Sequence, residues 1–194
     1  MLNSLSSEGI TVRNLQDQLD RFAGVAAEPR RVARYPVNEA MIRNWVEAHD
    51  DDNPIYVDDA AARAAGRPGV VCPPAMISTW VMAGYRRYRE IHRLRAEGHT
   101  EDFPYSRLLS LLDEAGFTSV VATDLTQEYV RDIHVGEHIT AHITIEAISP
   151  MKRTALGNGH FITLLKKYVN QDGELLVEER FRLLRFAPES RKDP

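Results

Sequence analysis

Three adjacent carboxylates, at residues 50–52, precede an Asn-Pro turn in the stretch HDDDNPIYVD. A carboxylate held at a core-facing turn can have its pKa tuned for general acid–base chemistry. A solvated run of charges at a helix end is the ordinary alternative. Against it, the helix dipole disfavours acids at a C-terminus, and Trp45 and Ile55 flank the run with apolar surface. The cluster is therefore a candidate acid site that still lacks a base.

The seven histidines show no compact metal-binding spacing. His138 and His142 are four residues apart in a segment that predicts a strand, which separates them by roughly 13 Å. The single cysteine, Cys72, excludes a zinc site built from several thiolates. We expect no metal and no cofactor.

Other catalytic motifs are weak. The sequence has no G-x-S-x-G nucleophile elbow and no P-loop, and GNGH at residues 157–160 lacks a third glycine, so it predicts a loop or bulge. Pro73-Pro74-Ala75-Met76 predicts a helix start, whose free N–H groups suit an oxyanion. Two prolines remove two of those donors, and a plain helix start stays the alternative.

The elements that position these residues begin with helices. Apolar spacing predicts a helix at residues 12–24, and RVARYPV at residues 31–37 could pair as a strand. Asn38 is the expected N-cap of the helix that runs into the acidic cluster. An alanine-rich helix at residues 58–66 follows. Residues 76–94 then predict one long helix, buried nearly all round to about residue 84 and polar beyond, where it should project towards solvent or a partner.

The second half of the chain predicts strands. After a loop and a short helix within residues 101–117, four β-branched and aromatic segments follow from residue 118, and QDGE at 171–174 predicts a hairpin turn. Helices followed by antiparallel strands indicate an α+β domain in which a sheet wraps one long apolar helix.

Composition narrows the class of protein. The chain has 194 residues, 43% hydrophobic and 27% charged, with a net charge of −4, which argues against nucleic acid as the main partner. No apolar run is long enough to span a bilayer, and the N-terminus does not resemble a signal peptide. One cysteine fits a reducing compartment, so we expect a cytoplasmic protein without a membrane partner.

The acidic stretch resembles the G-D-x-N-P-(L/I/V)-H signature of the MaoC-like enoyl-CoA hydratases, which have a hot-dog fold. The stretch RPGVVCPPAM at residues 67–76 is similar to that family's R-P-I-V-H-G-M entry to the hot-dog helix. The resemblance covers about residues 33–187. It implies three parts: an N-terminal helical arm (1–32), a MaoC-like hot-dog domain (33–187) and a C-terminal tail (188–194).

The departures from the signature concern the catalytic pair. Asp51 stands at the position of the family's catalytic Asp, but Tyr56 stands where the family has its His. Asp50 replaces the signature Gly, and Pro73-Pro74 replaces the His-Gly that supplies an oxyanion donor. A phenol with a pKa near 10 is a poor base at neutral pH. The resemblance thus implies a chain that has lost half of its acid–base machinery.

Further segments, among them NPIYVD, LLDEAGF and KRTALGNG, are similar to the degenerate MaoC-like domain of heteromeric steroid side-chain enoyl-CoA hydratases. This resemblance implies a lyase subunit of steroid (cholesterol) catabolism that gives room to a bulky 2-enoyl-CoA. A second hot-dog subunit would carry the catalytic Asp and His, and a thiolase-like aldolase system would be a further partner.

The resemblance assigns no confident catalytic residue to this chain. We expect substrate-binding roles for six residues, which we call the signature region: Asp51, Asn53, Tyr56, Cys72, Ala75 and Met76. Charge alone makes five residues candidates for the CoA phosphates, with solvated surface as the alternative for each: Arg67, Arg86, Arg87, Lys152 and Arg153.

Two other functions stay open. The first is a self-sufficient homodimeric hydratase or dehydratase in which Asp51 works with His49 or Tyr56. The second is a non-catalytic chain that binds acyl thioesters. A dehydratase subunit acting on carrier-protein thioesters is a variant of the heteromeric hydratase.

Overall fold

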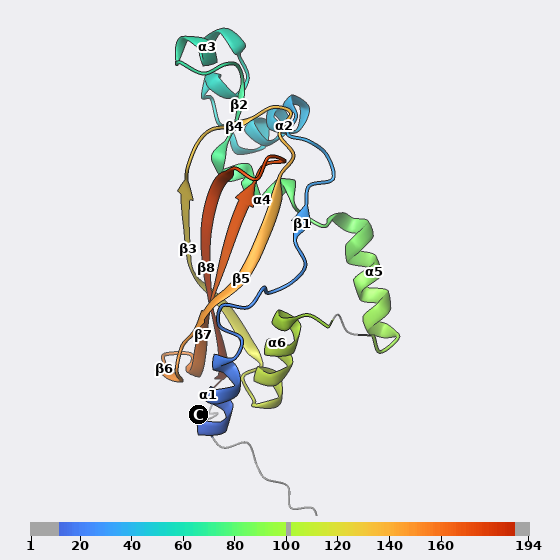
Figure 1. Cartoon of the computed structure of the whole chain (residues 1–194), viewed down its shortest axis with the longest axis vertical. Coiled ribbons are helices and arrows are strands. Elements are labelled where there is room, and N and C mark those ends of the chain that lie inside the picture. Colours follow the sequence, from blue (N-terminus) through green and yellow to red (C-terminus); the bar gives the residue numbers. More distant parts are fainter. Residues whose placement is uncertain (1–11, 100–101, 189–194) are drawn as a thin grey trace, which may run out of the picture.

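The structure is a computed structural model that describes residues 12–99 and 102–188. An antiparallel sheet with strand order β1-β5-β7-β8-β3 forms its body, β6 pairs with β7 beside that path, and β2 pairs with β4 separately. Figure 1 shows β7 and β8 running along the length of the molecule. The strands are Arg31–Val32 (β1), Val71–Cys72 (β2), Ser119–Tyr129 (β3), Ile133–His134 (β4), Thr140–Ile148 (β5), Lys152–Thr154 (β6), Gly157–Val169 (β7) and Leu175–Pro188 (β8).

The helices pack on the sheet in two groups, seen at opposite ends of it in Figure 1. α2 and α4 contribute Ile42 and Ile77 to one apolar cluster, whereas α1 and α6 contribute Leu19 and Leu108 to a second. No helix in the described ranges is long and apolar enough to cross a membrane. The helices are Val12–Asp20 (α1), Glu39–His49 (α2), Asp59–Ala64 (α3), Ile77–Trp80 (α4), Gly84–Ala96 (α5) and Pro104–Glu114 (α6), with 3-10 turns at Pro54–Tyr56 (η1) and Pro74–Met76 (η2).

The predicted long apolar helix is broken, which corrects the expectation for residues 76–94. α4 ends at Trp80, and the chain restarts as α5 at Gly84, whose φ of +76° belongs to the left-handed region that glycine tolerates. α5 has no buried residue and stands away from the sheet in Figure 1. Its five arginines leave too little apolar surface to bury, so the polar continuation projects from the domain as expected.

The GNGH stretch is a strand and not the loop or bulge that its glycines predicted. Gly157 to His160 begin β7 and pair with β8, and the first three of them also pair with β6. Gly159 is required by close packing, because a Cβ at this position would lie 2.3 Å from the backbone oxygen of Arg185. The glycine marks a close approach of two strands.

Several local predictions are confirmed. The side chain of Asn38 accepts a hydrogen bond from the Met41 N–H at 3.0 Å and caps α2. The QDGE segment closes the hairpin between β7 and β8, with Asn170 N–H donating to the Glu174 carbonyl at 3.0 Å. The RVARYPV segment pairs with the sheet through β1.

The N-terminal helix packs on the domain. Leu15 and Leu19 of α1 are buried in the same cluster as Ile145 of β5. The division of the chain at residues 32 and 187 stays a prediction, and residues 1–11 and 189–194, which include most of the expected tail, lie outside the described ranges.

Strand β3 forms one edge of the sheet and pairs only with β8 among the described strands. Most of its side chains are exposed on both faces. Val120 and Leu125 are each 59% exposed. An apolar edge strand of this length is an open template for pairing with another chain.

Candidate functional site

The signature loop begins where α2 ends. Asp50 is the C-cap, with φ +50° and ψ +41°, and its N–H bonds to the carbonyls of Glu47 and Val46. This left-handed conformation suits glycine, the residue of the family signature, and aspartate adopts it at some cost. Asp50 therefore occupies a backbone conformation that glycine would adopt without strain.

Asp51 and Asn53 hold the turn that follows. The Asp51 carboxylate accepts a hydrogen bond from the Asn53 N–H at 3.1 Å. The Asn53 side chain in turn accepts from the Ile55 N–H at 3.3 Å and caps η1. These local bonds give Asp51 a structural task, whereas the neighbouring Asp50 and Asp52 are exposed.

Tyr56 closes the loop. Its ring is partly buried against the α2–α4 cluster, which also contains Cys72 and Met76. Burial raises the pKa of the phenol, and the nearby Asp51 carboxylate raises it further. The hydroxyl is therefore protonated at neutral pH and can donate a hydrogen bond, but it is unsuited to act as a base.

No histidine in the described ranges hydrogen-bonds to Asp51 or Tyr56. His49 is the nearest in sequence, but its ring stacks on Trp45 at 3.9 Å between centroids, and its Nδ1 donates to the Trp45 carbonyl at 2.8 Å. An acid–base pair between His49 and Asp51 is thus absent from this arrangement.

The donor set for an oxyanion is poor. Pro73 and Pro74 have no N–H, and the Met76 N–H donates to the Pro73 carbonyl at 3.0 Å. Among these four residues, only Ala75 keeps an N–H for a ligand. The sequence-based expectation of a depleted oxyanion site agrees with this geometry.

Cys72 is buried and inert. The Trp80 indole donates a hydrogen bond to its sulfur at 3.3 Å, and the thiol contacts the Pro73 carbonyl at 3.3 Å. Burial raises the pKa of the thiol to about 12, so Cys72 is neutral and unreactive at physiological pH. Its contact with Trp80 links the signature region to the end of α4.

The five candidates for the CoA phosphates do not come together. Arg67 pairs with Asp132 at 2.9 Å beside the signature loop. Arg86 and Arg87 lie on α5, whereas Lys152 and Arg153 lie on β6, at the other end of the sheet from α3 in Figure 1. They form no common phosphate site.

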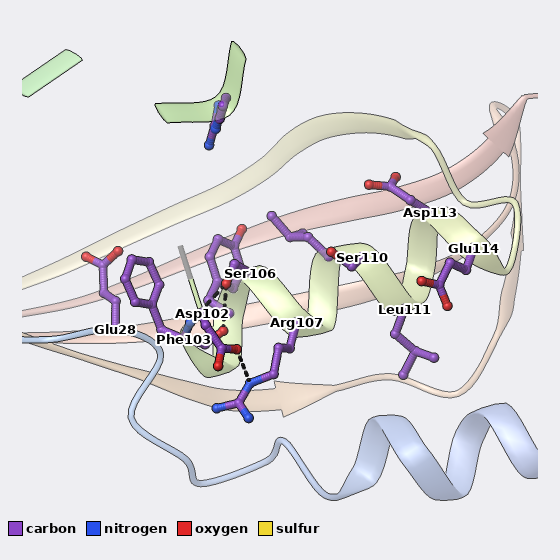
Figure 2. Close-up of a pocket in the computed structure, with 12 residues that line it drawn as sticks. Glu28, Asp102, Phe103, Ser106, Arg107, Ser110, Leu111, Asp113 and Glu114 are labelled. Atoms are coloured by element: carbon purple, nitrogen blue, oxygen red, sulfur yellow. Dashed lines mark hydrogen bonds and ion pairs between the residues drawn. The ribbon is translucent and has the colours of Figure 1, made fainter. Parts of the chain in front are cut away.

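Several hollows lie outside the signature region. A cavity of about 610 Å³ lies along α6. Figure 2 shows its lining, in which Arg107 pairs with Asp102 at 3.3 Å. A second cavity, of about 380 Å³, lies between β1 and α5 and has four arginines among its lining residues: Arg30, Arg31, Arg34 and Arg87. Of these four arginines, only Arg87 is a phosphate candidate from the sequence, because the two segments are far apart in the chain. No cluster of metal-ligating side chains exists among residues 12–99 and 102–188.

Residues 22–179 match a family model described as the FAS1-like dehydratase domain region. The chain belongs to this FAS1-like dehydratase family. A chain of the crystal structure of the ChsH1-ChsH2 complex from Mycobacterium tuberculosis superimposes with a TM-score of 0.75 at 38% identity, covering 93% of this chain and 94% of that one. The α+β hot-dog architecture and the MaoC-like resemblance are thereby confirmed.

Two curated relatives of this FAS1-like dehydratase chain are hydratase subunits by name. A probable enoyl-CoA hydratase alpha subunit of Thermomonospora curvata is 46% identical over 176 residues, 91% of this chain and 52% of the relative. The 3-oxo-4,17-pregnadiene-20-carboxyl-CoA hydratase alpha subunit of Mycobacterium tuberculosis is 42% identical over 178 residues, 91% of this chain and 53% of the relative. The chain spans about half the length of both.

A solved MaoC-like dehydratase shares the fold alone. It superimposes with a TM-score of 0.57 at 20% identity, covering 87% of this chain and 43% of that one.

Proposed function

We propose that this chain is the substrate-accommodating, catalytically degenerate subunit of a heteromeric enoyl-CoA hydratase that acts on a bulky, steroid side-chain 2-enoyl-CoA. The observation that carries the proposal is the arrangement of the signature loop. The Asp51 carboxylate accepts a hydrogen bond within the turn, and a protonated Tyr56 stands at the histidine position. The names of the two hydratase alpha subunits support the substrate class.

The reaction is addition of water across the C2–C3 double bond. Water adds its oxygen to C3 while a proton is delivered to C2, and no cofactor is consumed. The partner subunit's Asp and His would activate the water and supply that proton. In this chain the substrate would lie against the accessible part of the signature region, Asp51, Asn53, Tyr56 and Ala75. Cys72 and Met76 are buried in the apolar cluster and would support this surface from behind.

The broken helix supports a role in accommodating a large acyl group. α4 has four residues, about 6 Å of helix at 1.5 Å per residue. An unbroken helix over residues 76–94 would extend along the sheet several times further. A shorter helix covers less of the sheet than an unbroken helix would.

Strand β3 is the proposed contact with the second hot-dog subunit. Its open edge and exposed Leu125 offer backbone pairing and apolar surface. β3 also leads to Asp132, which pairs with Arg67 and lies close enough to Tyr56 to affect its pKa. A partner paired along β3 would therefore place its own groups beside the signature loop.

The assembly is proposed to act in the cytoplasm, in line with the single buried cysteine. Association with a thiolase-like aldolase system stays a prediction.

The test is hydration of an α,β-unsaturated steroid side-chain CoA ester by this chain alone and together with its hot-dog partner. Turnover only by the pair supports the proposal. Turnover by the chain alone favours a self-sufficient enzyme based on Asp51. Binding of the ester without turnover in any combination favours a non-catalytic thioester-binding protein. A parallel assay with a carrier-protein thioester distinguishes the two carriers.

A further inference from the structure

The cavity between β1 and α5, which we call the arginine cavity, gathers positive charge from two distant segments. Four arginines and one acid, Glu28, line it, and Glu90 pairs with Arg87 from outside, so these six side chains carry a formal charge of +4 − 2 = +2 in a chain whose net charge is −4. Glu28 pairs with Arg31, and Arg87 pairs with Glu90 at 3.1 Å. Arg30 and Arg34 have no ion-pair partner within residues 12–99 and 102–188. Such a concentration of like charge is unfavourable without an anion.

The start of α5 adds to this field. α5 has 13 residues, no acidic residue in its first turn and no side-chain cap. Two guanidinium nitrogens of Arg34 lie 3.9 and 4.0 Å from the position that a Cβ on Gly84 would take. The positive end of the helix dipole therefore coincides with a guanidinium, where a phosphate would satisfy both.

The lining also contains apolar surface. Met82 and Phe103 line the arginine cavity, together with Ile91 of α5. A volume of about 380 Å³ lies within the range of small-molecule sites. This combination fits a ligand that joins phosphates to a flat, weakly polar ring system, such as a nucleotide, better than it fits an extended acidic protein surface.

The position of the arginine cavity relative to the signature region indicates which nucleotide it would bind. Val81 and Met82 directly follow Trp80, whose indole bonds to Cys72 of the signature region. The signature region and the arginine cavity thus lie at the two ends of the short α4. A CoA thioester carries its thioester and its phosphates on opposite ends of a flexible arm.

The proposed partner does not cover the arginine cavity. β1 and β3 are opposite edges of the sheet, so a partner on β3 leaves the cavity open.

We infer that the arginine cavity binds the 3′-phosphoadenosine diphosphate end of a CoA thioester. This inference rests on the proposed function and gives the CoA phosphates a site that the signature region lacks. Arg34, which follows β1, and Arg87 of α5 bind the phosphates. Phe103 and Met82 contact the adenine base.

The test is calorimetric binding of free CoA and of pantetheine, which lacks the phosphates, to the full chain. We compare the wild type with Arg34→Gln, Arg87→Gln and the control Arg89→Gln. Arg89 lies on α5 but outside the arginine cavity, over the Tyr85 ring. We expect CoA binding about tenfold weaker in the first two variants, from lost charge-assisted hydrogen bonds. The control and all pantetheine affinities stay within twofold, and circular dichroism verifies the fold of each variant.

Equal CoA affinity in all four proteins overturns the inference, as does wild-type CoA binding no tighter than pantetheine binding. Turnover by the two-subunit pair separates this outcome from failure of the proposed function. If the pair hydrates substrate while Arg34→Gln and Arg87→Gln leave KM unchanged, the cavity assignment fails and the function stands. If the pair has no turnover although CoA binds at the arginines, the function fails and the nucleotide site stands.

Discussion

The Asp51 carboxylate accepts a hydrogen bond from the backbone N–H of Asn53, 3.1 Å away. This bond closes the turn after α2, and Asn53 then caps η1. The acid and amide of a hydratase signature therefore have structural tasks in this chain. Retention of Asp51 without a histidine partner follows from these tasks and requires no catalysis by this chain.

Replacing Tyr56 by phenylalanine tests its chemical role. Burial, and then the Asp51 carboxylate, holds the pKa of the phenol above its usual value, so it remains protonated across neutral pH. We expect Tyr56→Phe to change the kcat of the two-subunit pair less than about threefold, with the same pH profile from 6 to 9. Loss of a general base costs about 10²- to 10⁴-fold, and a fall of that size would show that Tyr56 takes part in proton transfer.

Replacing Leu125 by lysine tests the edge of the sheet. Leu125 is 59% exposed on β3, and a lysine there opposes edge pairing. We expect the affinity for the partner subunit, measured by analytical ultracentrifugation, to fall at least about tenfold, in line with loss of a buried leucine. Leu156→Lys is the matched control, because Leu156 is 48% exposed at the β6–β7 turn. Equal loss in both variants would mean that β3 is not the interface.

Glu137 makes stability dependent on pH. Burial raises the pKa of this carboxyl, but hydrogen bonds from Arg131 at 2.6 Å, the His134 N–H at 2.8 Å and Asn170 at 3.1 Å outweigh burial and lower it overall. A lowered folded-state pKa contributes stability above the unfolded-state value of about 4.3, and this contribution is lost as pH falls through the folded-state pKa.

We therefore expect Glu137→Gln to lower the free energy of unfolding by about 1–3 kcal/mol at pH 7. The difference from the wild type should shrink in urea melts below pH 4. Glu174→Gln is the control, since Glu174 binds the same Arg131 at 2.7 Å from an exposed position and should have a smaller effect. A difference that stays constant from pH 7 to 3.5 would exclude the charge of Glu137 as its cause.

Gly159 tests the close approach of β7 and β8. A methyl group at this position would lie 2.3 Å from the Arg185 carbonyl oxygen, so the backbone of one strand must move. We expect Gly159→Ala to lower the free energy of unfolding by at least about 2 kcal/mol. Asn158→Ala, at an exposed neighbouring position, should stay within about 0.5 kcal/mol of the wild type. Unfolding by denaturant measures both, and an alanine tolerated at 159 would contradict the packing argument.

Local chemistry made part of this structure predictable. Asn38 caps α2 and the QDGE segment closes a hairpin, because both depend on residues within four positions of one another. Tyr56 at the histidine position of the signature could also be read from the sequence, and the loss of the acid–base pair that it implies stays a prediction.

Features set by distant contacts were not predictable. Periodicity continued the helix past Trp80, although α5 buries no residue and starts as a separate helix at Gly84. GNGH looked like a loop, but Gly159 is there because β8 passes close to it. The arginine cavity joins Arg34 to Arg87 across 53 positions, and no local pattern indicates that these segments meet.

The most direct test of the central claim is hydration of an α,β-unsaturated steroid side-chain CoA ester by this chain purified alone. The same preparation is then assayed with its hot-dog partner, and the partner alone serves as the control. The account predicts no turnover by this chain alone and turnover by the pair, because this chain lacks a base beside Asp51. Turnover by this chain alone that Asp51→Asn abolishes would contradict it and make Asp51 a catalytic residue.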